Sequence, residues 1–355
     1  MGKHAQNRRM AYSTPIVLIA LLILFVSLIA LTGDKALARM AAETLIRVVL
    51  VVGLWIFVGN SGVVSFGHAG YMAIGAYCSA WLTLKPQMKA LFLPDLPEWL
   101  AQAQWPVLPA AIASGLLAAI VALISGAAIL RLSGIAASIA TFAFLAIVNT
   151  VYSNWEGVTG ATSSVVGLPR YVDQWVALAW AAAAILVANL YANSASGLAL
   201  RATREDEVAA SASGINMYRH RLLSLVISGF FTGVSGALLG HSIGVLNPDS
   251  FYLGITFISL AMLVVGGIGS LSGAVVGVLG LSMLIEMLVR LEQGVTLGGA
   301  RFALPGGAQE ILIGVVMILV LILRPSGLMA GKDLQLPRLP LSLHSKQTNP
   351  NRGDA

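Results

Sequence analysis

Charged residues are scarce in this sequence, and cysteine is almost absent. Only 10% of the 355 residues are charged, whereas 57% are hydrophobic. A soluble chain of this length would form two or three domains and would need many more polar residues to cover them. We therefore expect lipid to be the solvent for much of the surface. The single cysteine, Cys78, excludes a disulfide framework and a cysteine-based metal site.

Motifs for catalysis are also missing. The sequence has no Gly-x-x-x-x-Gly-Lys-Ser/Thr phosphate-binding loop, no HExxH motif and no nucleophile elbow. Its five histidines are dispersed, so we predict no metal site, no directly bound cofactor and no enzyme active site. The net charge of +6 comes from basic residues scattered among loops and tails. This pattern indicates a membrane orientation signal rather than a nucleic-acid partner.

Long apolar runs are present instead, and they predict an all-α polytopic membrane protein. A membrane helix needs about 20 mostly apolar residues, whereas barrel strands would give short alternating segments. We expect about ten transmembrane helices in one transmembrane domain over residues 15–323. The expected spans are 15–32, 40–59, 66–84, 106–130, 134–152, 174–192, 222–244, 254–269, 272–291 and 308–323.

Basic residues at the two ends of the chain predict its orientation. Lys3, Arg8 and Arg9 precede the first span, and five basic residues between 324 and 352 follow the last. An even number of spans puts both tails on one side, and their charge makes that side cytoplasmic. We therefore expect a cytoplasmic N-terminal tail over 1–14, a cytoplasmic loop over 193–221 and a cytoplasmic C-terminal tail over 324–355.

The first span has an alternative interpretation as a signal peptide, because the sequence Ala-Leu-Ala at 36–38 resembles a cleavage site. Its apolar region, 16–31, slightly exceeds the usual core of about 7–15 residues, so we expect the span to be retained. Cleavage would leave nine spans and the same orientation for the rest.

The loop 193–221 is the most unusual part of the sequence. Seven charged residues lie within residues 201–221, between very apolar segments. Thr203, followed by Glu205, Asp206 and Glu207, predicts a helix start, because a hydroxyl caps free backbone N–H groups and acids complement the helix dipole. Gly214 is well placed to end this helix. We expect a short cytoplasmic helix over 203–213.

An ordinary solvated loop is the alternative, but such loops are usually only about 4–6 residues long. A helix with an alanine and serine face can dock into a groove on a partner protein. The residues Ala209, Ala210 and Gly214 resemble the cytoplasmic coupling loop of ABC importer permeases, in which two alanines precede a glycine. Here the glutamate that usually precedes the alanines is displaced, because Val208 holds that position and Glu207 lies one residue earlier.

Further segments resemble permeases of branched-chain amino-acid importers, most closely the M-type member of the two that such importers use. The resemblance runs in order from about residue 45 to 325. Its segments are 62–70, 74–77, 130–134, 154–160, 167–169, 199–207, 247–250 and 265–273.

This resemblance implies a permease subunit in a bacterial cytoplasmic (inner) membrane. The expected partners are a second permease subunit, two cytoplasmic ATPase subunits that use ATP, and an extracytoplasmic substrate-binding protein. The substrates would be branched-chain or related hydrophobic amino acids, moved inward by alternating access. Urea or short amides are an alternative substrate class, and a stand-alone secondary transporter or channel is an alternative function.

Two more segments are candidate sites. The stretch 59–70 interrupts the apolar pattern, and irregular backbone at membrane depth is tolerated only inside protein or beside a wet cavity. We predict either a broken helix beside the substrate path, with candidate residues Gly62, Ser65, Gly67 and His68, or a tight turn between packed helices.

The stretch 153–170 predicts either an outer vestibule or binding-protein contact, or a turn-rich connector. Its candidate residues are Trp155, Glu156, Thr159 and Gly160.

Overall fold

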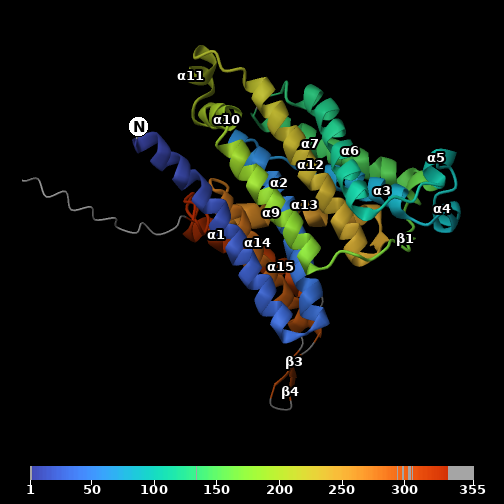
Figure 1. The fold of residues 1–355 in the computed structure, drawn as a ribbon. Coiled ribbons are helices and arrows are strands. Elements are labelled where there is room, and N and C mark those ends of the chain that lie inside the picture. Colours follow the sequence, from blue (N-terminus) through green and yellow to red (C-terminus); the bar gives the residue numbers. More distant parts are fainter. Residues whose placement is uncertain are drawn as a thin grey trace, which may run out of the picture.

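The computed structural model is a bundle of long helices with very little strand (Figure 1). It describes residues 2–132, 134–293, 295–297, 300–302, 305 and 307–334. The all-α fold class predicted from the apolar runs is confirmed.

Each predicted span coincides with a helix. In the part of the chain that the structure describes, eight helical spans are long and apolar enough to cross a membrane. One of them, Pro248–Gly266, reaches that length only because a 3-10 turn precedes the 14-residue helix α13. Helices α3 and α15 have only 16 residues each. The ten helices are α1 (Gly2–Thr32), α2 (Lys35–Ser61), α3 (His68–Thr83), α6 (Val107–Ile129), α7 (Gly134–Asn154), α9 (Gln174–Ala192), α12 (Met217–Ile243), α13 (Leu253–Gly266), α14 (Leu271–Gln293) and α15 (Ala308–Leu323).

Short elements fill the connections, and most of them were not predicted from the sequence. Two antiparallel strand pairs, β1 with β2 and β3 with β4, join segments outside the long helices. The short elements are α4 (Pro86–Phe92), α5 (Glu98–Ala101), α8 (Glu156–Thr159), β1 (Val165–Val166), α10 (Ala195–Glu205), α11 (Glu207–Ala212), β2 (Val245–Leu246), η1 (Pro248–Phe251), β3 (Val295–Leu297) and β4 (Ala300–Phe302).

The connections gather at two ends of the bundle. Helices α10 and α11 lie at one end, which we call the loop end, and the β3–β4 hairpin lies at the opposite end, which we call the far end (Figure 1). The chain alternates between these ends along the ten long helices. As a result, the breaks at 62–67 and 267–270 both lie at the loop end, as does the stretch after α15.

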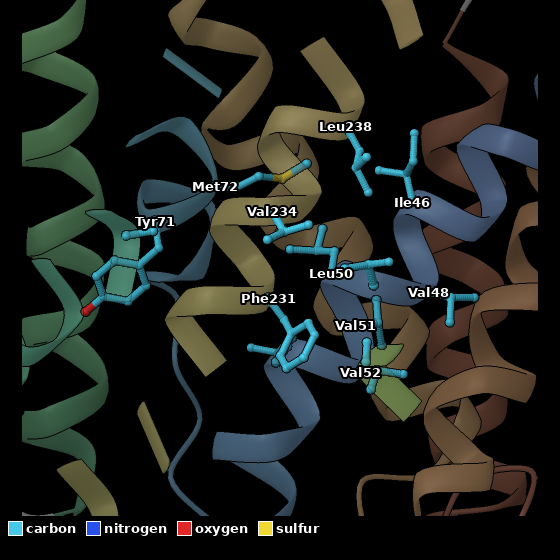
Figure 2. Close-up of a cluster of buried hydrophobic side chains, with 14 of the residues drawn as sticks. Ile46, Val48, Leu50, Val51, Val52, Tyr71, Met72, Phe231, Val234 and Leu238 are labelled. Atoms are coloured by element: carbon cyan, nitrogen blue, oxygen red, sulfur yellow. The ribbon is translucent and has the colours of Figure 1, made fainter. Parts of the chain in front are cut away.

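The core forms around α2, α3 and α12. Of the 21 positions of α2 from Ala41 to Ser61, 19 are buried, all but Glu43 and Arg47. Helix α3 is buried at every position except Trp81. Figure 2 shows side chains of these three helices meeting in one cluster. A helix of 16 residues spans about 24 Å, less than the hydrocarbon thickness of about 30 Å. Since α3 is enclosed by protein, the irregular chain before it needs no lipid contact.

Glycine lets α3 and α12 approach closely. A Cβ atom at Gly75 would lie 2.1 Å from the Gly233 carbonyl oxygen, and one at Gly236 would lie 1.9 Å from that of Met72. Any larger side chain would therefore force the two backbones apart. The glycine spacing along α12 acts in helix packing, as small residues do in membrane bundles.

Candidate functional site

The loop 193–221 contains two helices rather than one. Ser194 caps α10, and its hydroxyl oxygen accepts a hydrogen bond from the N–H of Gly197 at 3.2 Å. Asp206 caps α11 by accepting from the N–H groups of Val208 and Ala209, both at 2.9 Å. The prediction that Thr203 caps this helix is wrong. Thr203 lies within α10, buried, and its hydroxyl donates to the Leu200 carbonyl.

The end of α11 has the predicted glycine termination. Gly214 adopts a positive φ of 82°, its N–H donates to the Ser211 carbonyl, and the N–H of Ile215 donates to that of Ala210. This is the double hydrogen-bond pattern that commonly closes helices at a left-handed glycine. The C-terminal limit expected from the sequence is therefore correct, whereas its N-terminal limit moves from Thr203 to Asp206.

The two alanines of the candidate docking face differ in exposure. Val208 is 80% exposed and Ala209 is exposed as well, but Ala210 is buried against the chain itself. Glu205 and Asp206 are also exposed. A partner that approaches α11 therefore meets Val208 and Ala209 rather than the pair of alanines.

Two arginines attach this loop to the core helices. Glu207, at the start of α11, forms a salt bridge with Arg221 of α12, whose side chain is only 5% exposed. Arg204 of α10 donates from Nη1 to the carbonyl oxygen of Gly59, near the end of α2, at 2.7 Å. Any displacement of α10 and α11 would act on α2 and α12 through these contacts.

A cavity of about 370 Å³ lies between the loop and the first glycine-rich break. Gly62 and Val64 of the break line it on one side, and Thr203, Arg204 and Glu207 of the loop line it on another. Gly62 ends α2 with φ of 72°, and a Cβ there would lie 2.6 Å from Cγ of Arg204. The candidate path residue Gly62 and the candidate coupling residues Thr203 and Glu207 therefore share one cavity.

The other candidate path residues are enclosed. Ser65 and His68 are buried, and a Cβ at Gly67 would lie 3.0 Å from the Thr141 carbonyl oxygen. The Ser228 hydroxyl donates to the Gly53 carbonyl at 2.6 Å. Since that uses its only proton, Ser228 accepts from Nε2–H of His68 at 2.7 Å. In the neutral ring, Nδ1 then accepts from the Ser65 hydroxyl at 2.9 Å.

Both ring nitrogens of His68 therefore have partners inside the chain. The imidazole joins the break to α12 and, through Ser228, to α2. In this conformation neither the Ser65 nor the His68 side chain has a polar hydrogen free to donate to a substrate.

The segment 153–170 packs at the far end. Trp155 is 48% exposed and Glu156 is exposed, but Thr159 is fully buried and its hydroxyl bonds to the carbonyls of Tyr152 and Trp155. Gly160 ends α8 with φ of 75°. Of the four candidate contact residues, Trp155 and Glu156 are thus available to a partner, while Thr159 holds the turn together.

A buried lysine beside this segment was missed in the sequence. Lys89 of α4 is fully buried, and its Nζ donates to the carbonyls of Leu100 at 2.8 Å and Ala103 at 2.5 Å. Burial lowers the pKa of Lys89 to about 8. The far end thus has an ordered covering over residues 86–103, for which hydropathy gives no signal because the segment is short.

These features define a class of protein. The bundle of long apolar helices, with enclosed irregular breaks and a charged helical loop at one end, is that of a polytopic membrane transport protein. A family model described as "Branched-chain amino acid transport system / permease component" matches residues 36–321. The chain belongs to this family, and it is a multi-pass membrane permease.

Curated relatives agree with this assignment. The chain is 26% identical to the high-affinity branched-chain amino acid transport system permease protein LivM of Escherichia coli (strain K12), over 90% of this chain and 76% of the relative. It is 32% identical to the guanosine ABC transporter permease protein NupQ of Bacillus subtilis (strain 168), over 62% and 72%. It is 33% identical to the permease LivH of Salmonella typhimurium, over 39% and 41%. No solved structure matches.

Proposed function

We propose that this chain is one of two permease subunits in an ATP-driven importer of branched-chain or related hydrophobic amino acids. Its partners are a second permease, two cytoplasmic ATPase subunits and an extracytoplasmic binding protein. The loop end faces the cytoplasm, and the loop 193–221 is the coupling loop on which an ATPase subunit acts. Family membership and the LivM and LivH relatives support this proposal.

The anchoring of the coupling loop is the observation that carries the coupling mechanism. An exposed Val208–Ala209 surface is suited to docking in a groove. Behind it, the Glu207–Arg221 salt bridge and the Arg204–Gly59 hydrogen bond reach α12 and α2. Movement imposed by an ATPase on α11 would thus be passed to α2 and to α12, the helix against which α3 packs, as alternating access requires.

The cavity beside Gly62 is the proposed inner part of the substrate path. It combines apolar side chains with Arg204, Glu207 and Arg221. A hydrophobic amino acid needs an apolar lining and a few groups for its charged ends. Glu156 and Trp155 at the far end are the proposed contacts for the binding protein.

Reconstitution with the partner subunits tests the function. Vesicles that contain both permeases, both ATPases and the binding protein should accumulate leucine only when ATP is present. This chain alone should transport none, because it carries no phosphate-binding loop. ATP-independent leucine uptake by the purified chain would overturn the proposal.

A nucleoside is a second candidate substrate, because one relative is a guanosine permease. The same vesicles distinguish the two classes when guanosine and leucine are offered separately with matched binding proteins. Uptake of guanosine without leucine would replace the amino-acid assignment and leave the coupling mechanism intact.

Glu207→Gln tests the coupling mechanism, because it leaves the buried Arg221 guanidinium without its carboxylate. We expect uptake per ATP hydrolysed to fall at least about fivefold, by analogy with the cost of separating a partly buried ion pair. Glu205→Gln is the matched control, since Glu205 is 79% exposed and its contact with Arg204 is long at 3.7 Å. Equal uptake per ATP in both variants would exclude the salt bridge as the mechanical link.

A further inference from the structure

The chain after α15 turns back and binds the break at residues 267–270, between α13 and α14. The N–H of Leu328 donates to the carbonyl of Val265 at 2.8 Å, and that of Met329 donates to Gly266 at 3.1 Å. Both acceptors belong to the last turn of α13, whose final carbonyls have no partner within the helix. Residues 326–334, here called the C-terminal segment, therefore close the end of α13.

The same segment caps the helix on the other side of the break. The carboxylate of Asp333 accepts from the N–H of Ser272 at 3.1 Å, and the N–H of Leu334 donates to the Ser272 hydroxyl at 2.8 Å. This reciprocal pair of hydrogen bonds gives the Ser272 N–H a partner in the first turn of α14, and it places a negative charge at the positive end of the helix dipole. Ser272 is fully buried whereas Asp333 is exposed, so this contact lies at the boundary between the break and solvent.

Glycines bring the two backbones together. A Cβ at Gly327 would lie 2.4 Å from Cα of Gly267, and one at Gly267 would lie 2.9 Å from the Ser326 carbonyl oxygen. Gly327 has φ of 75° and Gly267 has φ of 116°, both in the region that favours glycine. The fit is between main chains, so the break and the C-terminal segment form one compact unit.

This unit also contacts α2. The indole N–H of Trp55 in α2 donates to the Ile268 carbonyl at 3.0 Å. Near the end of the same helix, the Gly59 carbonyl accepts from Nη1 of Arg204 in α10. The break is therefore connected through α2 to the first helix of the coupling loop.

We propose that the C-terminal segment is a positioning element of the transport cycle, which holds the α13–α14 break closed. Because the break bonds to Trp55 of α2, and α2 bonds through Gly59 to Arg204 of α10, α13 and α14 then move together with the coupling loop. The inference rests on the proposed function, but it concerns residues beyond the family match, which ends at residue 321.

Two truncations test the segment. A chain that ends at Leu334 keeps every contact described above, whereas a chain that ends at Lys332 lacks Asp333 and Leu334 and so leaves Ser272 unpaired. In the complete reconstituted importer, we expect the longer chain to import leucine as the full chain does. The shorter chain should hydrolyse ATP but import less leucine per ATP. Equal import per ATP by the two chains would overturn the proposal.

Asp333→Ala refines the test at one residue. We expect leucine import per ATP to fall about fivefold, the ratio that corresponds to a typical lost helix cap. Asp34→Ala is the matched control, because Asp34 caps α2 at the far end by accepting from the Ala36 N–H at 2.8 Å. An equal fall in both variants would mean that any lost cap has this effect, and it would overturn the positioning role.

Hydrogen exchange provides a readout that does not depend on transport. In the purified chain, the amides of 265–273 should exchange at least about tenfold faster when the chain ends at Lys332 than when it ends at Leu334. Unchanged exchange would show that the segment does not hold the break. If the exchange difference is found but the full chain imports no leucine with its partners, the proposed function fails while the structural contact stands.

Discussion

At the scale of single residues, two histidines fasten α3 to α12. His68 bonds to Ser228 through Nε2 at the loop end. His241 of α12 donates from Nδ1 to the Pro169 carbonyl at 2.9 Å, so its Nε2 accepts from the Ser79 hydroxyl of α3 at 2.7 Å. The two rings use opposite nitrogens as donors, but each places a neutral imidazole between the same pair of helices. Both act in packing, whichever substrate is carried.

His68→Ala should therefore weaken the bundle without changing substrate affinity. Loss of its two hydrogen bonds should lower the free energy of unfolding by about 1 kcal/mol, in line with interhelical bonds in membrane proteins. Thermal unfolding of the purified chain measures this, and the KM for leucine in the reconstituted importer should stay unchanged. His68→Ala and Ser228→Ala should be non-additive, because they remove the same contact. A large rise in KM with unchanged stability would instead put His68 in contact with substrate.

The sequence predicted that the stretch around His68 is irregular, but not what its side chains bind. The glycines and polar residues of 59–70 stand out from the apolar pattern, so the break itself was predictable. Ser228 follows His68 by 160 positions, inside an apolar span with no distinguishing signal. Whether a polar residue faces the path or a neighbouring helix depends on helix rotation, which span counting leaves open.

At the scale of elements, α11 depends on which residue supplies its cap. Thr203 and Asp206 both have side chains that cap helices well, and both precede residues that can form the first turn of a helix. The structure selects Asp206, because α10 begins at Ala195 after the Ser194 cap and carries Thr203 in its buried face. The apolar positions of α10 were too few for the sequence to indicate a separate helix. The predicted helix over 203–213 therefore merged parts of two.

Asp206→Ala should unfold α11 partially, and Asp206→Asn should preserve it. Alanine removes both cap bonds, at a cost of about 1 kcal/mol, whereas asparagine offers an equivalent acceptor. Hydrogen exchange at the Val208 and Ala209 amides should accelerate about fivefold in the alanine variant alone, since these amides donate to Asp206. Assembly with the ATPase should weaken in the same variant. Faster exchange in the asparagine variant too would show that charge, rather than hydrogen bonding, stabilises the helix.

At the scale of the whole molecule, the number and order of long helices were predictable, because each needs only a sustained apolar run. The far-end covering was not. Its helices α4, α5 and α8 are short, and they are positioned by contacts between distant segments. The indole N–H of Trp81 donates to the Val158 carbonyl, and the N–H of Asp95 donates to the Gly157 carbonyl. The C-terminal segment was expected to be a tail, because its position too depends on contacts with a distant part of the chain. Its partners in 265–272 lie more than fifty residues earlier.

The predicted orientation of the molecule, with both basic tails in the cytoplasm, can be measured directly by cysteine labelling. Cys78 is the only cysteine and is buried, and Cys78→Ala provides a background without thiols. Ser213→Cys places a thiol at an exposed position of the loop end, and Thr162→Cys places one at an exposed position of the far end. If the basic tails are cytoplasmic, a membrane-impermeant maleimide should label Ser213→Cys in inside-out vesicles and Thr162→Cys in right-side-out vesicles. The reverse pattern would put α11 outside the cell, beyond the reach of any cytoplasmic ATPase, and would exclude the coupling mechanism together with the orientation.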